Sequence, residues 1–170
     1  VIPIQMANLA CIIANRGYYY IPHLVKKVGN EGSIDEMYST KHYTKVDSTY
    51  FNIIVNSMQK VVEKGTGYNA YLRGIPICGK TGTAQIAGGT GYLKKYISSF
   101  VGFVNDDKGN SYTIGVTVIN PNPIRPHYYA AQSAVPVFKE IIQNLIKLNY
   151  LSPKEDINLL FNFIIYLGFI

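Results

Sequence analysis

The chain has 170 residues, a length that fits one domain or a large piece of one. Its 48% hydrophobic and 15% charged residues supply a core and exclude intrinsic disorder. The net charge of +6 is mildly basic, and its densest points are only the Lys26-Lys27 and Lys94-Lys95 pairs. We therefore expect no nucleic-acid partner, which would require a basic patch. The excess of positive charge could equally favour acidic surfaces such as a cell wall or anionic lipid.

The two cysteines, Cys11 and Cys78, lie in the apolar contexts ACII and PICG. Buried free thiols are the expected outcome there, with a disulfide as the alternative. The sequence holds no Cys-x-x-Cys motif and no His/Cys cluster, so we expect no metal site. The first residues, VIPIQMANLA, lack an initiator Met and the basic start of a signal peptide, which is typical of a piece cut from something longer.

The first third of the chain predicts one helix and an irregular region. Residues 3–15 carry apolar side chains at three-and-four spacing, with Pro3 in the first turn and Asn15-Arg16-Gly17 as the C-cap. Residues 18–28 are aromatic and β-branched apart from a proline, which indicates an extended segment or edge strand. Residues 29–46 are polar and rich in turn formers, so a loop or irregular hairpin is expected.

A second helix is predicted over residues 48–64. Asp47-Ser48 offers its N-cap, and Gly65-Thr66-Gly67 ends it. Its apolar residues form one stripe that should face a core, namely Phe51, Ile54, Val55, Met58, Val61 and Val62.

Three strands of one antiparallel sheet are predicted next, at about 75–86, 97–104 and 112–120. The sequence NDDKGN between the last two has the chemistry of a hairpin turn, whereas AGGTGYLKKY between the first two is glycine-rich and predicts a mobile linker. A last helix is expected near 131–148, with Pro136 in its first turns. The fold class predicted is therefore α+β, a three-stranded sheet flanked by helices.

Residues 1–150 are expected to form one structural unit, followed by a tail, 151–170, of unknown role. The stretch INLLFNFIIYLGFI, residues 157–170, has 11 apolar residues in 14 positions. A membrane-spanning helix needs about 20 such residues, so this stretch is too short as it stands. Either it packs on a partner lobe or the chain is truncated within it.

The stretch GIPICGKT, from Gly74 to Thr81, matches the phosphate-binding pattern G-x-x-x-x-G-K-[ST]. That motif needs a buried strand before it and a helix that begins at the Lys-Thr pair. The preceding GYNAYLRG is polar and turn-like, and the following GTAQIAGGTGY holds four glycines that disfavour a helix. A P-loop nucleotide-binding fragment therefore remains only as an alternative.

The second interpretation takes Lys80-Thr81-Gly82 as the K-T-G motif of serine acyltransferases that react with penicillin. A lysine ammonium beside a hydroxyl can hold a carboxylate and polarise a neighbouring hydroxyl network. A glycine at Gly82 leaves room for a substrate backbone to lie along the strand as an added strand. The motif belongs on a strand that borders an active site, which agrees with the strand predicted over 75–86.

The surrounding sequence strengthens this interpretation over roughly residues 4–146. In order, the matching pieces are PIQMANLACIIANRG, IPHLVKKV, MQKVVEKGTG, GKTGTAQ, YISSFVGFVNDD, YTIGVTVINPNP and YYAAQSAVPVFKEII. The chain resembles the C-terminal half of the transpeptidase domain of class B penicillin-binding proteins, which are peptidoglycan D,D-transpeptidases. The SSFVGF and AVPVFKEI segments look most like the division (septal) subtype, with the elongation subtype close behind.

The resemblance implies roles for four adjacent residues. Lys80 would join the hydrogen-bond network of a Ser-x-Asn serine, and Thr81 and Thr83 would bind the carboxylate of a D-Ala-D-Ala stem peptide or of a β-lactam. The backbone N–H of Thr83 would supply half of the oxyanion hole. Gly82 would be the small residue that admits the ligand. The alternative is that all four are ordinary strand residues without a functional role.

The nucleophile of this family is a serine followed three residues later by lysine. Ser57-Met58-Gln59-Lys60 has that spacing, but it lies in the middle of the helix predicted over 48–64 and only 20 residues before Lys80, and the chain contains no Ser-x-Asn. We interpret Ser57 as a surface residue. The nucleophile is therefore expected in residues upstream of Val1, and this chain alone is expected to be inactive.

The resemblance further implies the rest of the biochemistry. The intact enzyme would cross-link stem peptides through a serine acyl-enzyme, without metal or cofactor, and would sit in the bacterial inner membrane with its catalytic domain periplasmic or extracellular. Expected partners are the stem peptide, β-lactams, the upstream lobe of the same domain and a membrane glycosyltransferase. A non-catalytic peptidoglycan-binding or scaffold module is the second alternative.

Overall fold

The computed structural model describes residues 2–154 apart from residues 26, 28, 30, 31, 33, 90 and 123. The apolar stretch 157–170 and its two interpretations thus lie outside the described residues. The elements run in the order α1 (Pro3–Ala14), β1 (Tyr18–Tyr19), α2 (Glu36–Ser39), β2 (His42–Tyr43), α3 (Ser48–Lys64), η1 (Tyr68–Ala70), β3 (Ile77–Gly88), β4 (Gly91–Asn105), β5 (Ser111–Ile119), η2 (Ala130–Gln132) and α4 (Ala134–Lys147).

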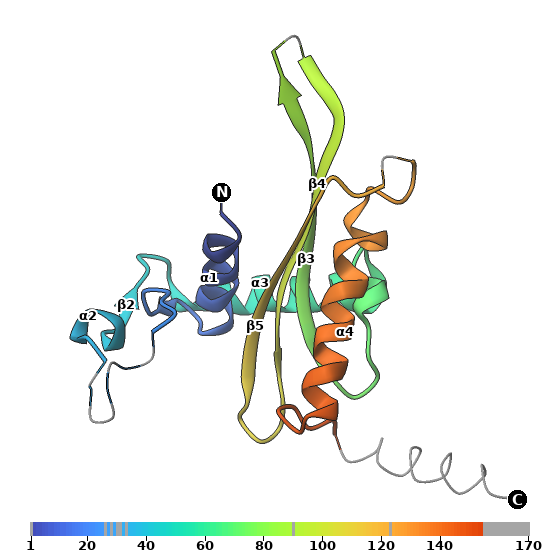
Figure 1. The fold of residues 1–170 in the computed structure, drawn as a ribbon. Helices are drawn as coiled ribbons and strands as arrows, with labels where there is room; N and C mark the ends of the chain where they lie inside the picture. Colours follow the sequence, from blue (N-terminus) through green and yellow to red (C-terminus); the bar gives the residue numbers. More distant parts are fainter. Residues whose placement is uncertain are drawn as a thin grey trace, which may run out of the picture.

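The centre of the molecule is an antiparallel sheet with the strand order β3-β4-β5 (Figure 1). The predicted α+β class, with three antiparallel strands flanked by helices, is confirmed. Strand β3 lies at an edge and pairs with β4 so that Thr81 is opposite Phe100 and Thr83 is opposite Ser98. The sequence prediction that Lys80-Thr81-Gly82 lies on a strand is therefore confirmed, whereas its place beside an active site stays a prediction.

Helices cover both faces of this sheet, because its strands carry apolar side chains on both. On one face, α4 packs Phe138 against Phe100, with ring centroids 4.7 Å apart. On the other face, α1 and α3 enclose a smaller core that contains Cys78 and Phe103 of the sheet. In Figure 1, α4 crosses in front of the sheet and α3 passes behind it. The sheet is thus the middle layer of three.

Helix α3 shows how local sequence positions an element beside the site. Its N-cap is Asp47, as expected, whose carboxylate accepts a hydrogen bond from the Thr49 N–H. The helix ends at Lys64, before the predicted Gly65-Thr66-Gly67 terminator. The predicted stripe is buried at Phe51, Val55, Met58 and Val62, but Ile54 is 39% exposed and faces outward.

The prediction of a glycine-rich linker between the first two sheet strands is wrong. Strands β3 and β4 continue through it, pair as far as Ala87 with Tyr92 and Gly88 with Gly91, and project as a long hairpin (Figure 1). The glycines cluster at the turn, where Gly91 has a φ of +141°. They permit the chain reversal, and the flanking Tyr-Leu-Lys-Lys-Tyr segment extends the ladder.

Two further boundaries differ from the predictions. Among the described residues of the expected extended segment, only Tyr18–Tyr19 forms a strand, and it pairs with His42–Tyr43 in the region expected as a loop or irregular hairpin. The helix expected over 131–148 is divided into η2 and α4. The division falls at Ser133, whose hydroxyl donates to the Tyr129 carbonyl 2.8 Å away and competes with regular helix formation. Pro136 then lies in the first turn of α4, as expected.

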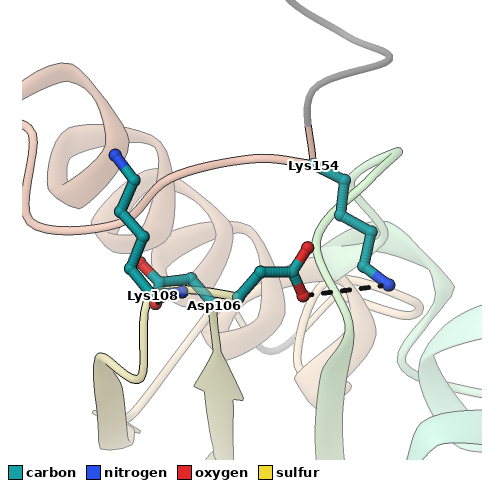
Figure 2. Close-up of polar contacts among 4 residues, drawn as sticks. Asp106, Lys108 and Lys154 are labelled. Carbon is teal, nitrogen blue, oxygen red and sulfur yellow. Dashed lines mark hydrogen bonds and ion pairs between the residues drawn. The ribbon is translucent and has the colours of Figure 1, made fainter.

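The turn between β4 and β5 fastens the chain that follows α4. The Asp106 carboxylate accepts hydrogen bonds from the backbone N–H groups of Lys108, Asn110 and Ser152, at 2.8–3.0 Å, and from the Asn110 side chain. Beside it, Lys154 Nζ lies 3.9 Å from an oxygen of Asp107, and this contact is the dashed line that ends on Lys154 in Figure 2. Asp106 of the NDDKGN turn thus holds Ser152 in place, and Asp107 adds an exposed ion pair with Lys154.

We expect the contribution of Asp106 to vanish in acid. Hydrogen bonds, first that from the Asn110 side chain and then those from backbone N–H groups, lower the pKa of Asp106. A lowered folded-state pKa stabilises the fold above the ordinary aspartate pKa of about 3.9, and this stabilisation is lost as the pH falls through the folded-state value. Asp106→Ala should therefore lower the melting temperature at pH 7 and have much less effect near pH 2. Asp107→Ala, which removes only an exposed ion pair, should change little at either pH.

Candidate active site

Lys80, Thr81, Gly82 and Thr83 stand in succession near the middle of β3. Lys80, Gly82 and Thr83 are exposed, and Thr81 is half-buried. Among the described strands, β3 pairs only with β4, so its other edge carries no strand partner. An exposed edge of this kind can add an extended peptide through main-chain hydrogen bonds.

Two glycines of this strand have opposite surroundings. Gly79 lies under the Phe100 ring, where an added Cβ would come within 2.2 Å of a ring carbon. At Gly82 an added Cβ would meet only the Ser99 carbonyl oxygen, 4.0 Å away. Gly79 is therefore required by internal packing, whereas the space beside Gly82 is open. An open position next to an unpaired strand edge is what a closely approaching ligand backbone needs.

The Thr81 hydroxyl has a partner that the sequence interpretation missed. Thr66 Oγ1, in the turn after α3, lies 2.8 Å from Thr81 Oγ1. If Thr66 donates this hydrogen bond, the Thr81 hydrogen remains available to an incoming acceptor. In the sequence, Gly65-Thr66-Gly67 indicates the end of the second helix and a match to the family, and neither signal assigns Thr66 to the site.

The Thr83 hydroxyl is oriented by the segment that precedes α4. Its oxygen accepts a hydrogen bond from the Ala130 backbone N–H at 3.2 Å. A hydroxyl that accepts one hydrogen bond still has its own hydrogen to donate. Directly opposite on β4, the fully buried Ser98 hydroxyl pairs with that of Ser133, 2.5 Å away. These contacts connect the predicted site to the η2 segment, which the sequence alone does not reveal.

Thr83→Val should destabilise the protein by about 1–3 kcal/mol, because the buried Ala130 N–H would lose its acceptor. Thr83→Ser keeps the hydroxyl and should cost less than about 1 kcal/mol. Urea denaturation of the two variants and the parent measures the difference. Equal stability of the Val and Ser variants would mean that this hydrogen bond does not hold the segment.

The Lys80 ammonium remains close to its own strand. Nζ donates to the Thr81 carbonyl oxygen at 2.8 Å. Because side chains alternate along a strand, Lys80 and Gly82 point to the face opposite Thr81 and Thr83. A small cavity of about 70 Å³ lies beside Lys80, Thr81 and Gly82, next to Pro3 and Met6 of α1. The exposed Lys80 side chain thus borders both solvent and this cavity.

The surroundings of Ser57 and Lys60 are not those of a catalytic nucleophile and its base. Ser57 is exposed on α3, and its hydroxyl donates to the Ile53 carbonyl oxygen at 2.8 Å. This is the ordinary bond of a serine to its own helix. The P-loop alternative is disfavoured as well, because Lys80 and Thr81 lie within a strand and no helix begins there.

Three tyrosines border the strand beyond Thr83. Tyr96, which is opposite Gln85 on β4, stacks on Tyr128 with ring centroids 4.1 Å apart, and Tyr129 lies 4.5 Å from Tyr128. The Arg125 guanidinium lies 5.8 Å from the Tyr129 ring. Tyr128 and Tyr129, from the loop before η2, thus lie at the end of the site. The sequence alone assigns them no role.

The remaining candidates for chemistry are few in the described part of the chain. Both cysteines are free, as expected. Burial raises the pKa of Cys78 to about 11, so its thiol is a poor nucleophile at neutral pH. In residues 2–154, with the gaps given above, no three His, Cys, Asp or Glu side chains gather as metal ligands. Over the same residues, the helices are too short or too polar to cross a membrane.

Comparison with known proteins assigns the family. Residues 1–143 match the family model described as penicillin binding protein transpeptidase domain. The chain therefore belongs to the transpeptidase-domain family of penicillin-binding proteins.

Among the proteins of this family, the chain is similar in sequence to peptidoglycan D,D-transpeptidases named FtsI. The chain is 27% identical over 154 residues to a peptidoglycan D,D-transpeptidase FtsI of Buchnera aphidicola, an alignment that covers 89% of the chain and 25% of the relative. It is 30% identical over 166 residues to an FtsI homolog of Mesostigma viride, with 89% and 27% covered. The chain thus spans about a quarter of the length of these relatives.

Solved structures agree with the fold. The transpeptidase domain of Burkholderia pseudomallei penicillin-binding protein 3 superposes with a TM-score of 0.68 at 25% identity, and the match covers 91% of this chain and 44% of that one. A D,D-transpeptidase domain from Eggerthella lenta gives a TM-score of 0.59 at 27% identity, with 84% and 32% covered. The fold of this chain is therefore similar to that of transpeptidase domains of the FtsI type.

Proposed function

We propose that this chain supplies one side of the active site of a serine D,D-transpeptidase that cross-links peptidoglycan stem peptides. We call this side, formed by residues 80–83 of β3, the K-T-G wall. The observation that carries the proposal is the set Lys80, Thr81, Gly82 and Thr83 on the open edge of β3, with both threonine hydroxyls already held by partners. Family membership supports the same assignment.

The geometry suggests how the wall would act. A D-Ala-D-Ala stem peptide or a β-lactam would lie along the β3 edge beside Gly82, where an added Cβ would meet only the Ser99 carbonyl oxygen. Thr81 and Thr83 would donate their free hydroxyl hydrogens to its carboxylate. The Thr83 N–H would supply half of an oxyanion hole, and Lys80 would polarise the hydroxyl network next to the acylated serine.

The reaction then follows serine acyl transfer. The serine oxygen would attack the carbonyl carbon of the penultimate D-Ala, and the terminal D-Ala would leave with its amine protonated. An acceptor amine would next displace the serine from the acyl-enzyme. Because Ser57 is bonded to its own helix, we assign the nucleophile and the Ser-x-Asn serine to residues outside this sequence. Accordingly, the chain alone would not acylate.

The wider context belongs to the same proposal. Residues 1–150 would form the C-terminal half of the transpeptidase domain, with the division subtype favoured over the elongation subtype; two relatives are named FtsI or FtsI homolog. The enzyme would be anchored in the inner membrane, with this domain in the periplasm or outside the cell. The upstream lobe of the domain and a membrane glycosyltransferase would be its protein partners.

The test is to join this chain to the serine-bearing lobe of a relative and measure D-Ala release from a D-Ala-D-Ala stem peptide. We expect release that stops when the serine of that lobe is replaced by alanine and continues in a Ser57→Ala variant. Peptide binding without release or covalent adduct, in a folded fusion, would instead identify a non-catalytic wall-binding module.

A further inference from the structure

Two tyrosines, one at the start of η1 and one directly after it, form an exposed aromatic pair that the candidate active site does not use. Tyr68 is 58% exposed and Tyr71 is 41% exposed. Their rings are nearly parallel, with an interplanar angle of 3° and centroids 5.8 Å apart. Rings in full face-to-face contact would have centroids about 3.5–4 Å apart, so this pair is offset. Each ring therefore leaves part of a flat face open to solvent.

Hydrogen bonds fix this pair beside the open edge of β3. Just before the pair, Thr66 Oγ1 lies 2.8 Å from Thr81 Oγ1. Between the two tyrosines in the sequence, Asn69 Nδ2 donates to the Ala131 carbonyl oxygen of η2 at 2.8 Å. The η2 segment also orients the Thr83 hydroxyl. The segment that carries the pair is thus tied to the K-T-G wall twice, once directly and once through η2.

The open ring faces suit a saccharide. A sugar ring carries hydroxyls at its rim and C–H groups on its faces, and these C–H groups pack against the electron-rich face of an aromatic ring. The tyrosine hydroxyl at the edge of each ring can exchange hydrogen bonds with the rim of the sugar. Tyrosine also gives a large contact area at a low cost in conformational entropy. Because the planes of Tyr68 and Tyr71 are parallel, both rings can contact one extended saccharide.

We propose that Tyr68 and Tyr71 bind the glycan strand of peptidoglycan while its stem peptide lies along the edge of β3. The inference deepens the proposed function and rests on it for the identity of the saccharide. Stem peptides are attached to a glycan of β-linked N-acetylated sugars, so a peptide held at the K-T-G wall carries sugar rings with it. The pair would bind this part of the substrate away from the reacting atoms and take no part in acyl transfer.

Binding of chitotetraose, a tetramer of β-linked N-acetylglucosamine, to the full chain tests this site without any acylation chemistry. In protein labelled with fluorotyrosine, fluorine NMR follows the individual tyrosines, whose signals are assigned with Tyr→Phe variants. We expect the signals of Tyr68 and Tyr71 to shift in a saturable way and that of Tyr43 to stay constant. Tyr43 is 71% exposed and belongs to the two-stranded sheet β1–β2, on the other side of the central sheet from η1 (Figure 1).

Substitutions in the pair should weaken the binding of the sugar. Tyr68→Ala or Tyr71→Ala should raise the Kd for chitotetraose about ten-fold, an effect typical of the loss of one aromatic stacking partner. Tyr68→Phe keeps the ring and should remain within about three-fold of the parent, because only an exposed hydroxyl is lost. Tyr43→Ala is the matched control and should leave the Kd unchanged. Melting temperatures verify that each variant is folded.

Three results would overturn the glycan site. These are the lack of a saturable shift at Tyr68 and Tyr71, an equal loss of affinity in Tyr43→Ala and Tyr68→Ala, and shifts of the pair with a free stem peptide but not with chitotetraose. The last result would identify a peptide as the occupant. Sugar binding and D-Ala release are measured separately, so a fusion that releases no D-Ala contradicts the transpeptidase proposal, whereas a chain that binds no sugar contradicts this one.

Discussion

Lys80→Met should reduce penicillin acylation by about 100-fold or more once this chain is joined to a serine-bearing lobe, because a positioned proton-transfer network typically contributes 10²–10⁴-fold. Lys80 is exposed, and its one described hydrogen bond is to the neighbouring Thr81 carbonyl. Its removal should therefore leave the stability of the fold nearly unchanged. The acylation rate is measured with a fluorescent penicillin.

Two control variants separate the role of Lys80 from general charge. Lys80→Arg keeps the positive charge but replaces a compact ammonium with a planar fork, so partial activity is expected. Lys94→Met removes a lysine from the same hairpin, away from the motif, and should acylate normally. An acylation rate for Lys80→Met close to that of the parent fusion would remove Lys80 from the mechanism.

Phe138→Ala should destabilise the chain by about 3–5 kcal/mol, the usual cost of emptying a fully buried aromatic site. Phe138 has no exposed surface, and its ring packs edge-on against Phe100. Phe100 in turn covers Gly79 and stands opposite Thr81, so the loss should also loosen the strand that carries the site. Urea denaturation followed by circular dichroism measures the change.

The neighbouring Val137 offers the comparison for this variant. It is 42% exposed on the same helix, and Val137→Ala should cost no more than about 0.5 kcal/mol. Phe138→Leu retains most of the volume and should fall between the two. Similar costs for Phe138→Ala and Val137→Ala would mean that α4 does not pack on the sheet as described.

The features that could be predicted from the sequence are those that local patterns determine. Asp47 caps α3 because a carboxylate can reach the N–H groups of a first helical turn, and this depends on adjacent residues alone. The strand around Lys80 could be predicted because residues 75–86 begin as an apolar stretch and are followed by a glycine-rich turn signal. The resemblance implies that this strand lies beside an active site, and that role stays a prediction.

The contacts that complete the candidate site could not be predicted in the same way. Thr66 and Thr81 are 15 residues apart, and Ala130 and Thr83 are 47 apart, so both hydrogen bonds depend on how separate elements pack. The hairpin beyond Gln85 was missed because glycine disfavours strands on average, whereas here the glycines serve the turn. The strand conformation of this hairpin depends on the hydrogen bonds between β3 and β4 rather than on the local preference of each residue.

The most direct test of the account is the intact mass of this chain after incubation with a reactive penicillin, beside a Ser57→Ala control. The account assigns the K-T-G wall to residues 80–83 and the nucleophile to residues outside this sequence, so neither protein should gain mass. A stoichiometric adduct that disappears in Ser57→Ala would contradict it, because the serine on α3 would then be the nucleophile.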